Sequence, residues 1–240
     1  ISSTLDRAAP KVVINAAAQA NVNLAETEFD QSVKVNGLGP ALLADACRSR
    51  NIRLVHISTD YVLTGRATPG ALLRESDQVS PRSRYAESKR IGEQAALERG
   101  AAVVRVQWVY RPGGRGFFTV AMERLAAGLP LKLVVDQIGS PTPSSVVAEG
   151  LLAVARGSAT GLYQLACEGE TSAYGWIRRG AQLLGLSFDV EMIRRAALAG
   201  AFRPERSVLD STRLIQDFGY RPPEWRSALA EAIDTEDWEP

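Results

Sequence analysis

The sequence has few of the residues on which metal and hydrolytic sites depend. Its 240 residues include two cysteines and one histidine. Cys47 and Cys167 lie far apart without C-x-x-C spacing, so we interpret them as structural thiols of a reducing compartment. His56 lies inside an apolar segment, which favours a packed core residue over a ligand or base. These counts predict no zinc site, and no G-x-S-x-G motif is present to indicate a serine hydrolase.

The sequence also lacks a large net charge and long hydrophobic runs. The formal net charge of +1 gives no electrostatic basis for binding nucleic acid. No apolar run reaches 18 residues and no signal-peptide pattern is present, so we expect a cytoplasmic protein that does not bind membranes. Only four of the 28 basic residues are lysine, which makes Lys89 conspicuous.

The segment Tyr85-Ala-Glu-Ser-Lys89 places a phenol and an ammonium four residues apart. In a helix, side chains at this spacing lie on one face, one turn from each other. An ammonium next to a phenol favours the phenolate, so we expect the pKa of Tyr85 to fall and the phenol to act as a tuned proton donor. Alone, the pattern also fits a surface helix that carries one aromatic residue and one cation.

The surrounding sequence favours the catalytic interpretation. Residues 54–58 are a short apolar run that predicts a buried strand, and Thr59 and Asp60 follow it directly. Residues 83–97 predict a helix, and residues 101–108 predict the next strand. This order is typical of a doubly wound α/β fold, in which chemistry occurs beyond the carboxyl ends of the strands. We therefore expect the Thr59 hydroxyl to lie next to the substrate oxygen that receives the proton from Tyr85.

Two segments near the N-terminus each allow more than one interpretation. Residues 11–14 predict a strand that leads into Asn15-Ala-Ala-Ala18, where small side chains would allow a ligand, or only a crossing helix, to approach the backbone. Asn36 lies within a stretch of helical periodicity that continues to Arg48. Its amide is either exposed or locally bonded, or it points toward the active site.

The chain resembles the extended short-chain dehydrogenase/reductases, and among them the dTDP-4-dehydrorhamnose reductases. The resemblance extends from residue 11 to about residue 230. It rests on Asn15-Ala-Ala-Ala18, Ser58-Thr-Asp-Tyr-Val62, Tyr85-x-x-x-Lys89, Trp108-Val-Tyr110, Asp136-Gln-x-x-Ser-Pro-Thr142 and Arg203-Pro-x-x-Ser-x-Leu209. The Tyr-x-x-x-Lys pair identifies the superfamily, whereas the other segments narrow the resemblance to enzymes that act on nucleotide-linked keto sugars.

This resemblance implies a reaction and a role for each catalytic residue. The C4 keto group of dTDP-4-dehydro-6-deoxy-L-mannose would be reduced to dTDP-L-rhamnose by hydride from NADPH or NADH. Tyr85 would protonate the C4 oxygen, Thr59 would hydrogen-bond to it, and Lys89 would hold the nicotinamide ribose. The implied partner is the dTDP-linked 4-keto-6-deoxy sugar, and a homodimer is an expected assembly. Some relatives bind Mg²⁺ at a dimer contact, but no carboxylate cluster assigns such a site here.

The resemblance also implies the binding residues and the domain organisation. Besides Tyr85 and Lys89, the cofactor-binding residues are Ala18, Gln19 and Ala20, and the substrate-binding residues are Thr59, Asp60, Trp108, Tyr61 and Val22. Residues 1–129 would form a Rossmann-like NAD(P)-binding domain. Residues 130–240 would mostly form a smaller substrate-binding part, with residues 143–167 returning to the first domain.

The sequence departs from the family pattern in three respects. Family members begin with a strand and a G-x-x-G-x-x-G turn that holds the cofactor pyrophosphate. No such turn precedes Lys11, so we expect an N-terminally incomplete sheet that starts on the order of fifty residues into the pattern. Gln19 replaces a usual aromatic residue and Gln107 a small hydroxyl residue, which affects the shape of the pocket.

Two alternative functions stay open. One is reduction of another NDP-4-keto-deoxysugar, and the other is that of a non-catalytic homologue such as a methionine adenosyltransferase regulatory subunit.

Overall fold

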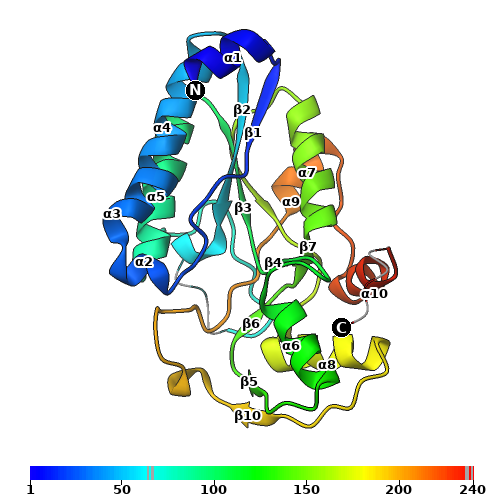
Figure 1. The fold of residues 1–240 in the computed structure, drawn as a ribbon. Coiled ribbons are helices and arrows are strands. Elements are labelled where there is room, and N and C mark those ends of the chain that lie inside the picture. The colour runs from blue at the N-terminus through cyan, green and yellow to red at the C-terminus, as the bar shows by residue number, and fades with distance from the viewer. Residues whose placement is uncertain (64, 66–67, 236–237, 239) are drawn as a thin grey trace.

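A parallel sheet of four strands forms the centre of the larger part of the molecule (Figure 1). The computed structural model describes residues 1–63, 65, 68–235, 238 and 240. The strands lie in the order β1 (Val12–Asn15), β2 (Arg53–Thr59), β3 (Ala102–Val106) and β8 (Gly161–Leu165), and each neighbouring pair is parallel. Their carboxyl ends therefore meet at one edge of the sheet.

Helices cover both faces of this sheet. On one face, α4 (Gly39–Arg48) and α5 (Arg84–Glu98) bury a cluster that includes Leu54 and Val103. On the other face, α7 (Ser144–Arg156) and α9 (Thr212–Phe218) pack against Val104 and Val106 of β3 (Figure 1). Strands buried on both faces form nearly continuous apolar runs, which is why the sequence revealed them. The predicted doubly wound parallel fold class is confirmed.

Helix α5 carries Tyr85 and Lys89, and its position is closely defined. It begins after Ser83, whose hydroxyl accepts a 3.2 Å hydrogen bond from Ala86 N. In its second half, Gly92 meets the backbone of Asn36, because a β-carbon at Gly92 would lie 2.0 Å from Asn36 O. The absence of a side chain at Gly92 thus allows the two segments to make direct backbone contact.

The long helix predicted around Asn36 is interrupted. Helix α3 (Phe29–Val33) continues into a π-helical turn, Lys34–Leu38, before α4 begins at Gly39. Asn36 is fully buried in this turn. Single π-helical turns inside helices occur frequently at functional sites.

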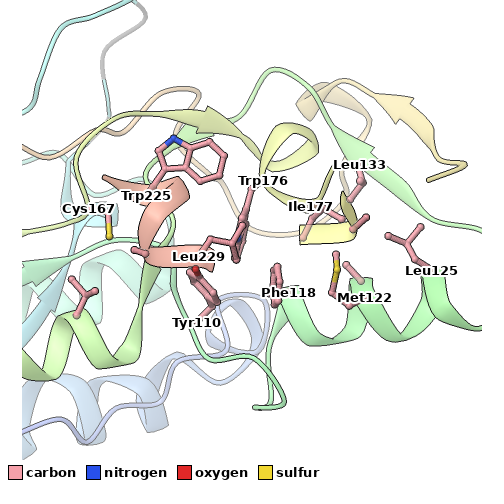
Figure 2. Close-up of a cluster of buried hydrophobic side chains, with 14 residues drawn as sticks. Tyr110, Phe118, Met122, Leu125, Leu133, Cys167, Trp176, Ile177, Trp225 and Leu229 are labelled. Atoms are coloured by element: carbon pink, nitrogen blue, oxygen red, sulfur yellow. The ribbon is translucent and has the colours of Figure 1, made fainter. Parts of the chain in front are cut away.

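A second hydrophobic core lies beyond the carboxyl ends of the strands (Figures 1 and 2). It joins α6 (Phe117–Ala126), α8 (Ala173–Leu183) and α10 (Trp225–Thr235). The rings of Phe118 and Trp176 are stacked with centroids 5.5 Å apart. The predicted boundary between residues 129 and 130 stays a prediction; α6, which precedes it, packs in this second core, whereas β8 pairs with β3.

Short elements complete the fold. Three two-stranded pairs are β4 with β7 (parallel), β5 with β10 (parallel) and β6 with β9 (antiparallel). The remaining bounds are α1 Ser2–Ala8, α2 Leu24–Thr27, β4 Val109–Tyr110, β5 Lys132–Val134, β6 Ile138–Gly139, β7 Thr142–Pro143, β9 Thr171–Ser172, β10 Glu191–Ile193 and the 3-10 turns Asp60–Val62 and Arg195–Ala197. Among the described residues, no helix has the length and apolar character needed to span a membrane.

Candidate active site

A cavity of about 740 Å³ opens where β1, β2 and β3 end. The loop after β1, the end of β2, helix α5 and helix α7 all contribute to its wall. Nine of the ten predicted site residues line it: Ala18, Ala20, Val22, Thr59, Asp60, Tyr61, Tyr85, Lys89 and Trp108. Gln19 is not in the wall. The structure therefore brings together residues that are up to 90 positions apart in the sequence (108 − 18).

Lys89 is held against the end of β2. Its side chain is 3% exposed, and Nζ donates a 2.7 Å hydrogen bond to the carbonyl oxygen of Ile57. An ammonium has three donors, so two remain for groups in the cavity. Burial lowers the pKa of Lys89 to about 8, although the nearby charge of Glu93 acts in the opposite direction.

The pKa of Tyr85 changes in the direction opposite to the sequence prediction. Burial raises it to about 12, while a hydrogen bond with Thr59 acts to lower it. The prediction of a lowered pKa was therefore wrong, because desolvation of the phenolate outweighs its interactions. The ammonium of Lys89 instead binds a backbone carbonyl. At neutral pH the phenol is consequently fully protonated.

Thr59 and Asp60 form the turn that closes the end of β2. Thr59 Oγ1 accepts a 3.2 Å hydrogen bond from Tyr61 N and donates one of 3.2 Å to Asp60 Oδ1. The Asp60 side chain is 2% exposed, and burial raises its pKa to about 7 despite these hydrogen bonds. The site thus contains a carboxyl group that titrates near neutral pH, one residue from the hydroxyl expected to contact substrate.

Asn36 fastens the loop after β1 to helix α5. Its Oδ1 accepts a 2.8 Å hydrogen bond from Gln19 N, and its Nδ2 donates to Gln19 O and to Ser88 Oγ, each at 3.0 Å. Neither alternative for this amide is therefore correct: it is neither exposed nor bonded to its sequence neighbours, and it does not line the cavity, but joins two segments that are distant in the sequence. Both side-chain polar atoms of Gln19 are buried without a hydrogen-bond partner among the described residues, whereas Ala18 and Ala20 face the cavity.

Trp108 stands between two cavities. A second cavity of about 460 Å³ shares Trp108, Tyr61, Val109 and Phe117 with the first. Trp108 has a left-handed backbone (φ 42°), which is strained for a residue with a large side chain. Its indole covers Gly139, where a β-carbon would lie 2.5 Å from the ring. Strain of this kind is retained at functional sites because the surrounding structure enforces it.

His56 is a core residue, as the sequence indicated. It is fully buried, and its Nδ1 accepts a 3.1 Å hydrogen bond from the Asn15 amide. Burial, followed by the charge of Lys89, lowers its pKa to about 3, which removes it as a general base near neutral pH. Within the described ranges, no group of three or more His, Cys, Asp or Glu side chains is arranged to hold a metal ion.

Comparison with known proteins places this arrangement in a family. The sequence model of the RmlD substrate binding domain matches residues 1–237. The chain belongs to the RmlD substrate binding domain family. The dTDP-4-dehydrorhamnose reductase of Mycobacterium tuberculosis is 40% identical over 233 residues, which cover 92% of this chain and 76% of that protein.

Solved structures agree with the family assignment. A dTDP-4-dehydrorhamnose reductase from Clostridium acetobutylicum superposes with a TM-score of 0.92 at 30% identity, covering 99% of this chain and 85% of that one. The Bacillus anthracis enzyme, in complex with NADP, gives a TM-score of 0.92 at 25% identity, covering 98% and 84%. The resemblance inferred from the short motifs is thus confirmed for this RmlD substrate binding domain family member.

Sequence reasoning missed part of the site. Helix α7 lines the cavity with four uncharged residues, Ser144, Val147, Ala148 and Leu151. The second cavity includes Arg203 and Lys132, two cations from distant segments. Arg203 belongs to a motif that the sequence analysis recognised, but no local pattern indicated that Lys132 would line the second cavity with it.

Proposed function

We propose that this chain reduces the C4 keto group of dTDP-4-dehydro-6-deoxy-L-mannose to dTDP-L-rhamnose with NAD(P)H. The observation that carries the proposal is the convergence of Thr59, Tyr85 and Lys89 on one cavity in a member of this family. A tyrosine and a lysine one helical turn apart, together with a hydroxyl at a strand end, supply what carbonyl reduction requires besides the hydride: a proton, and hydrogen bonds that hold the substrate oxygen in place.

The cavity suits the nicotinamide end of the cofactor. Its wall includes exposed small residues, Ala16, Ala18 and Ala20, which leave room for a planar ring near the backbone. Lys89 retains two ammonium donors for the adjoining ribose and for the Tyr85 oxygen. When bound, NAD(P)H supplies the hydride that reduces C4.

The protein's own groups manage the proton. Tyr85, with its pKa raised to about 12, enters the reaction as a protonated phenol and gives its proton to the C4 oxygen. Thr59 turns its single hydroxyl hydrogen from Asp60 Oδ1 to the same oxygen and fixes its position. The phenolate left behind is stabilised by the Lys89 ammonium, so the lysine is needed most after proton transfer has begun.

The second cavity provides a place for the nucleotide part of the substrate. Arg203 and Lys132 offer positive charge to a diphosphate, and Trp108 and Tyr61 lie at the junction where the sugar would meet the first cavity. Arginine is suited to phosphate because its planar donors bind two oxygens at once. A ligand that spans both cavities would therefore present its keto group to Tyr85.

The direct experiment measures oxidation of NADPH or NADH by the full-length protein with the keto-sugar nucleotide as substrate. We expect turnover by the wild type and a loss of about a hundredfold or more in Tyr85→Phe, which retains the ring but no transferable proton. Absence of oxidation in the wild type, with Tyr85→Phe behaving identically, overturns the proposal. Other NDP-4-keto-deoxysugars in the same assay define the sugar, and sedimentation equilibrium tests the predicted homodimer.

A further inference from the structure

A fully buried carboxylate lies one helical turn beyond Lys89. Tyr85, Lys89 and Glu93 follow one another at intervals of four residues on the face of α5 that meets the sheet. Glu93 is 0% exposed. Burying a charge is expensive unless the charge is paired and hydrogen-bonded, so this position requires a physical explanation.

Four hydrogen bonds satisfy the Glu93 carboxylate. Arg105 on β3 donates to both oxygens, at 2.9 Å from Nε and 2.7 Å from the terminal nitrogen. Ser58 Oγ donates at 2.7 Å and Arg90 at 2.6 Å. Arg105 is also fully buried, and its second terminal nitrogen has no hydrogen-bond partner among the described residues. The cluster is therefore rich in positive charge and depends on one carboxylate.

This cluster is attached to the catalytic residues on both sides. Ser58, which donates to Glu93, immediately precedes Thr59 on β2, and it lies opposite Arg105 in the sheet. Lys89, one turn before Glu93, binds the carbonyl of Ile57, the residue before Ser58. Adjacent turns of α5 are thus joined to adjacent residues of β2. Lys89 donates to Ile57 O, and Glu93 accepts from Ser58.

We propose that Glu93 is a positioning residue for the reduction, which fixes α5 against the end of β2 and provides the counter-charge that keeps Lys89 an ammonium. This role rests on the function proposed above. The Coulomb attraction of Glu93 is what opposes the effect of burial on Lys89. Without the carboxylate, the buried Arg105 would lose its ion-pair partner, and the buried Lys89 would lose the negative charge one helical turn away.

The electrostatic surroundings of Lys89 are limited to a few groups. Helix α7 contributes only uncharged residues to the cavity wall. Among the described residues, the titratable or charged side chains around Lys89 are Tyr85, Arg90 and Glu93 on α5, His56 on β2, Asp60 and Tyr61 in the following turn, and Arg105 on β3; both arginines bind Glu93. His56 is neutral near pH 7, and Asp60 is only partly ionised there because burial raises its pKa to about 7, so Glu93 is the one full negative charge in this set.

The first test measures the ionisation of Lys89 by NMR without any turnover. The sequence has four lysines, and Lys11, Lys34 and Lys132 are exposed, so protein made with ¹³Cε-lysine gives one buried signal, which Lys89→Arg assigns. In Glu93→Gln we expect its titration midpoint to fall by about one pH unit or more. The matched control is Glu87→Gln, an exposed glutamate on the same helix that pairs with Arg84; it should leave the midpoint unchanged. An unchanged midpoint in Glu93→Gln overturns the inference.

The second test separates charge from shape. Glu93→Asp retains the carboxylate and should keep the midpoint near that of the wild type. Arg90→Gln removes a cation that is 32% exposed and should raise the midpoint, the opposite of the effect of Glu93→Gln. If Glu93→Gln does not fold, an Arg90→Gln midpoint equal to that of the wild type overturns the inference.

The third test links the charge to catalysis. The alkaline limb of kcat should move to lower pH in Glu93→Gln by the amount seen in the NMR titration, and should stay in place in Glu87→Gln. A merely structural role would lower kcat at every pH without moving the limb. If the wild type turns over but the Glu93→Gln limb stays in place, this inference fails alone. If the wild type does not turn over, the proposed function fails, while the NMR titration still decides whether Glu93 supplies the counter-charge.

Discussion

Replacing Asp60 by asparagine should change how the stability of the protein depends on pH. Burial raises the pKa of this carboxyl group from 3.8 to about 7. Between about pH 4 and pH 7, folded Asp60 therefore holds a proton that the unfolded chain has released, so the free energy of unfolding falls as pH rises. One pKa unit corresponds to about 1.4 kcal/mol, which makes the loss over three units about 4 kcal/mol.

Asp60→Asn removes this ionisation and retains the shape of the side chain. We expect its free energy of unfolding to fall by about 4 kcal/mol less than that of the wild type between pH 4 and pH 8. Urea unfolding followed by circular dichroism across this range measures the difference. The control is Asp45→Asn, which removes an exposed carboxylate that pairs with Arg99; it should leave the fall between pH 4 and pH 8 close to that of the wild type. Equal falls in Asp60→Asn and the wild type would refute the reasoning.

Three further substitutions test other parts of the site. Thr59→Val keeps the shape but loses the hydroxyl, and should lower kcat/KM about a hundredfold in the NAD(P)H assay with little change in melting temperature; full activity would remove Thr59 from the mechanism. Asn36→Ala leaves the backbone groups of Gln19 unpaired and should cost about 1–3 kcal/mol for each unsatisfied group, measured by urea unfolding. Gly92→Ala should destabilise by about 1–3 kcal/mol because its β-carbon would meet Asn36 O at 2.0 Å. Gly39→Ala, where the nearest atom is 3.4 Å away, is the matched control and should be neutral or stabilising; equal stabilities of the two alanine variants would contradict the close packing.

The sequence predicted the central strands and the candidate trio of Thr59, Tyr85 and Lys89 because these features are local. The apolar run before Thr59 and the spacing of Tyr85 and Lys89 need no knowledge of distant residues. The helix predicted at residues 83–97 matches α5, Arg84–Glu98, to within one residue at each end. Local patterning of this kind fixes which residues face the sheet, and it therefore indicated which side chains could meet.

Other features depended on contacts that local patterns do not contain. The pKa of Tyr85 is governed by burial, which results from the packing of four elements rather than from its neighbour Lys89. No local pattern distinguishes Glu93 from other helical glutamates, because its buried partner Arg105 lies on the next strand. The π-helical turn at Lys34–Leu38 was missed for another reason: Gly37, Gly39 and Pro40 are local signals of an interrupted helix, but the apolar spacing around them was read as one continuous helix.

That π-helical turn bears on which changes of chain length the protein can tolerate. A π turn contains more residues than an α turn, so deleting one residue within Lys34–Leu38 would allow a regular helix to form. The following residues would keep their orientation, because the regular helix spans the same turn with one residue fewer, and only the turn that carries Asn36 would change its course. Asn36 could no longer reach both Gln19 and Ser88. We therefore expect insertions and deletions to be tolerated in surface loops but not in this segment, although it lies in a helix without a catalytic group.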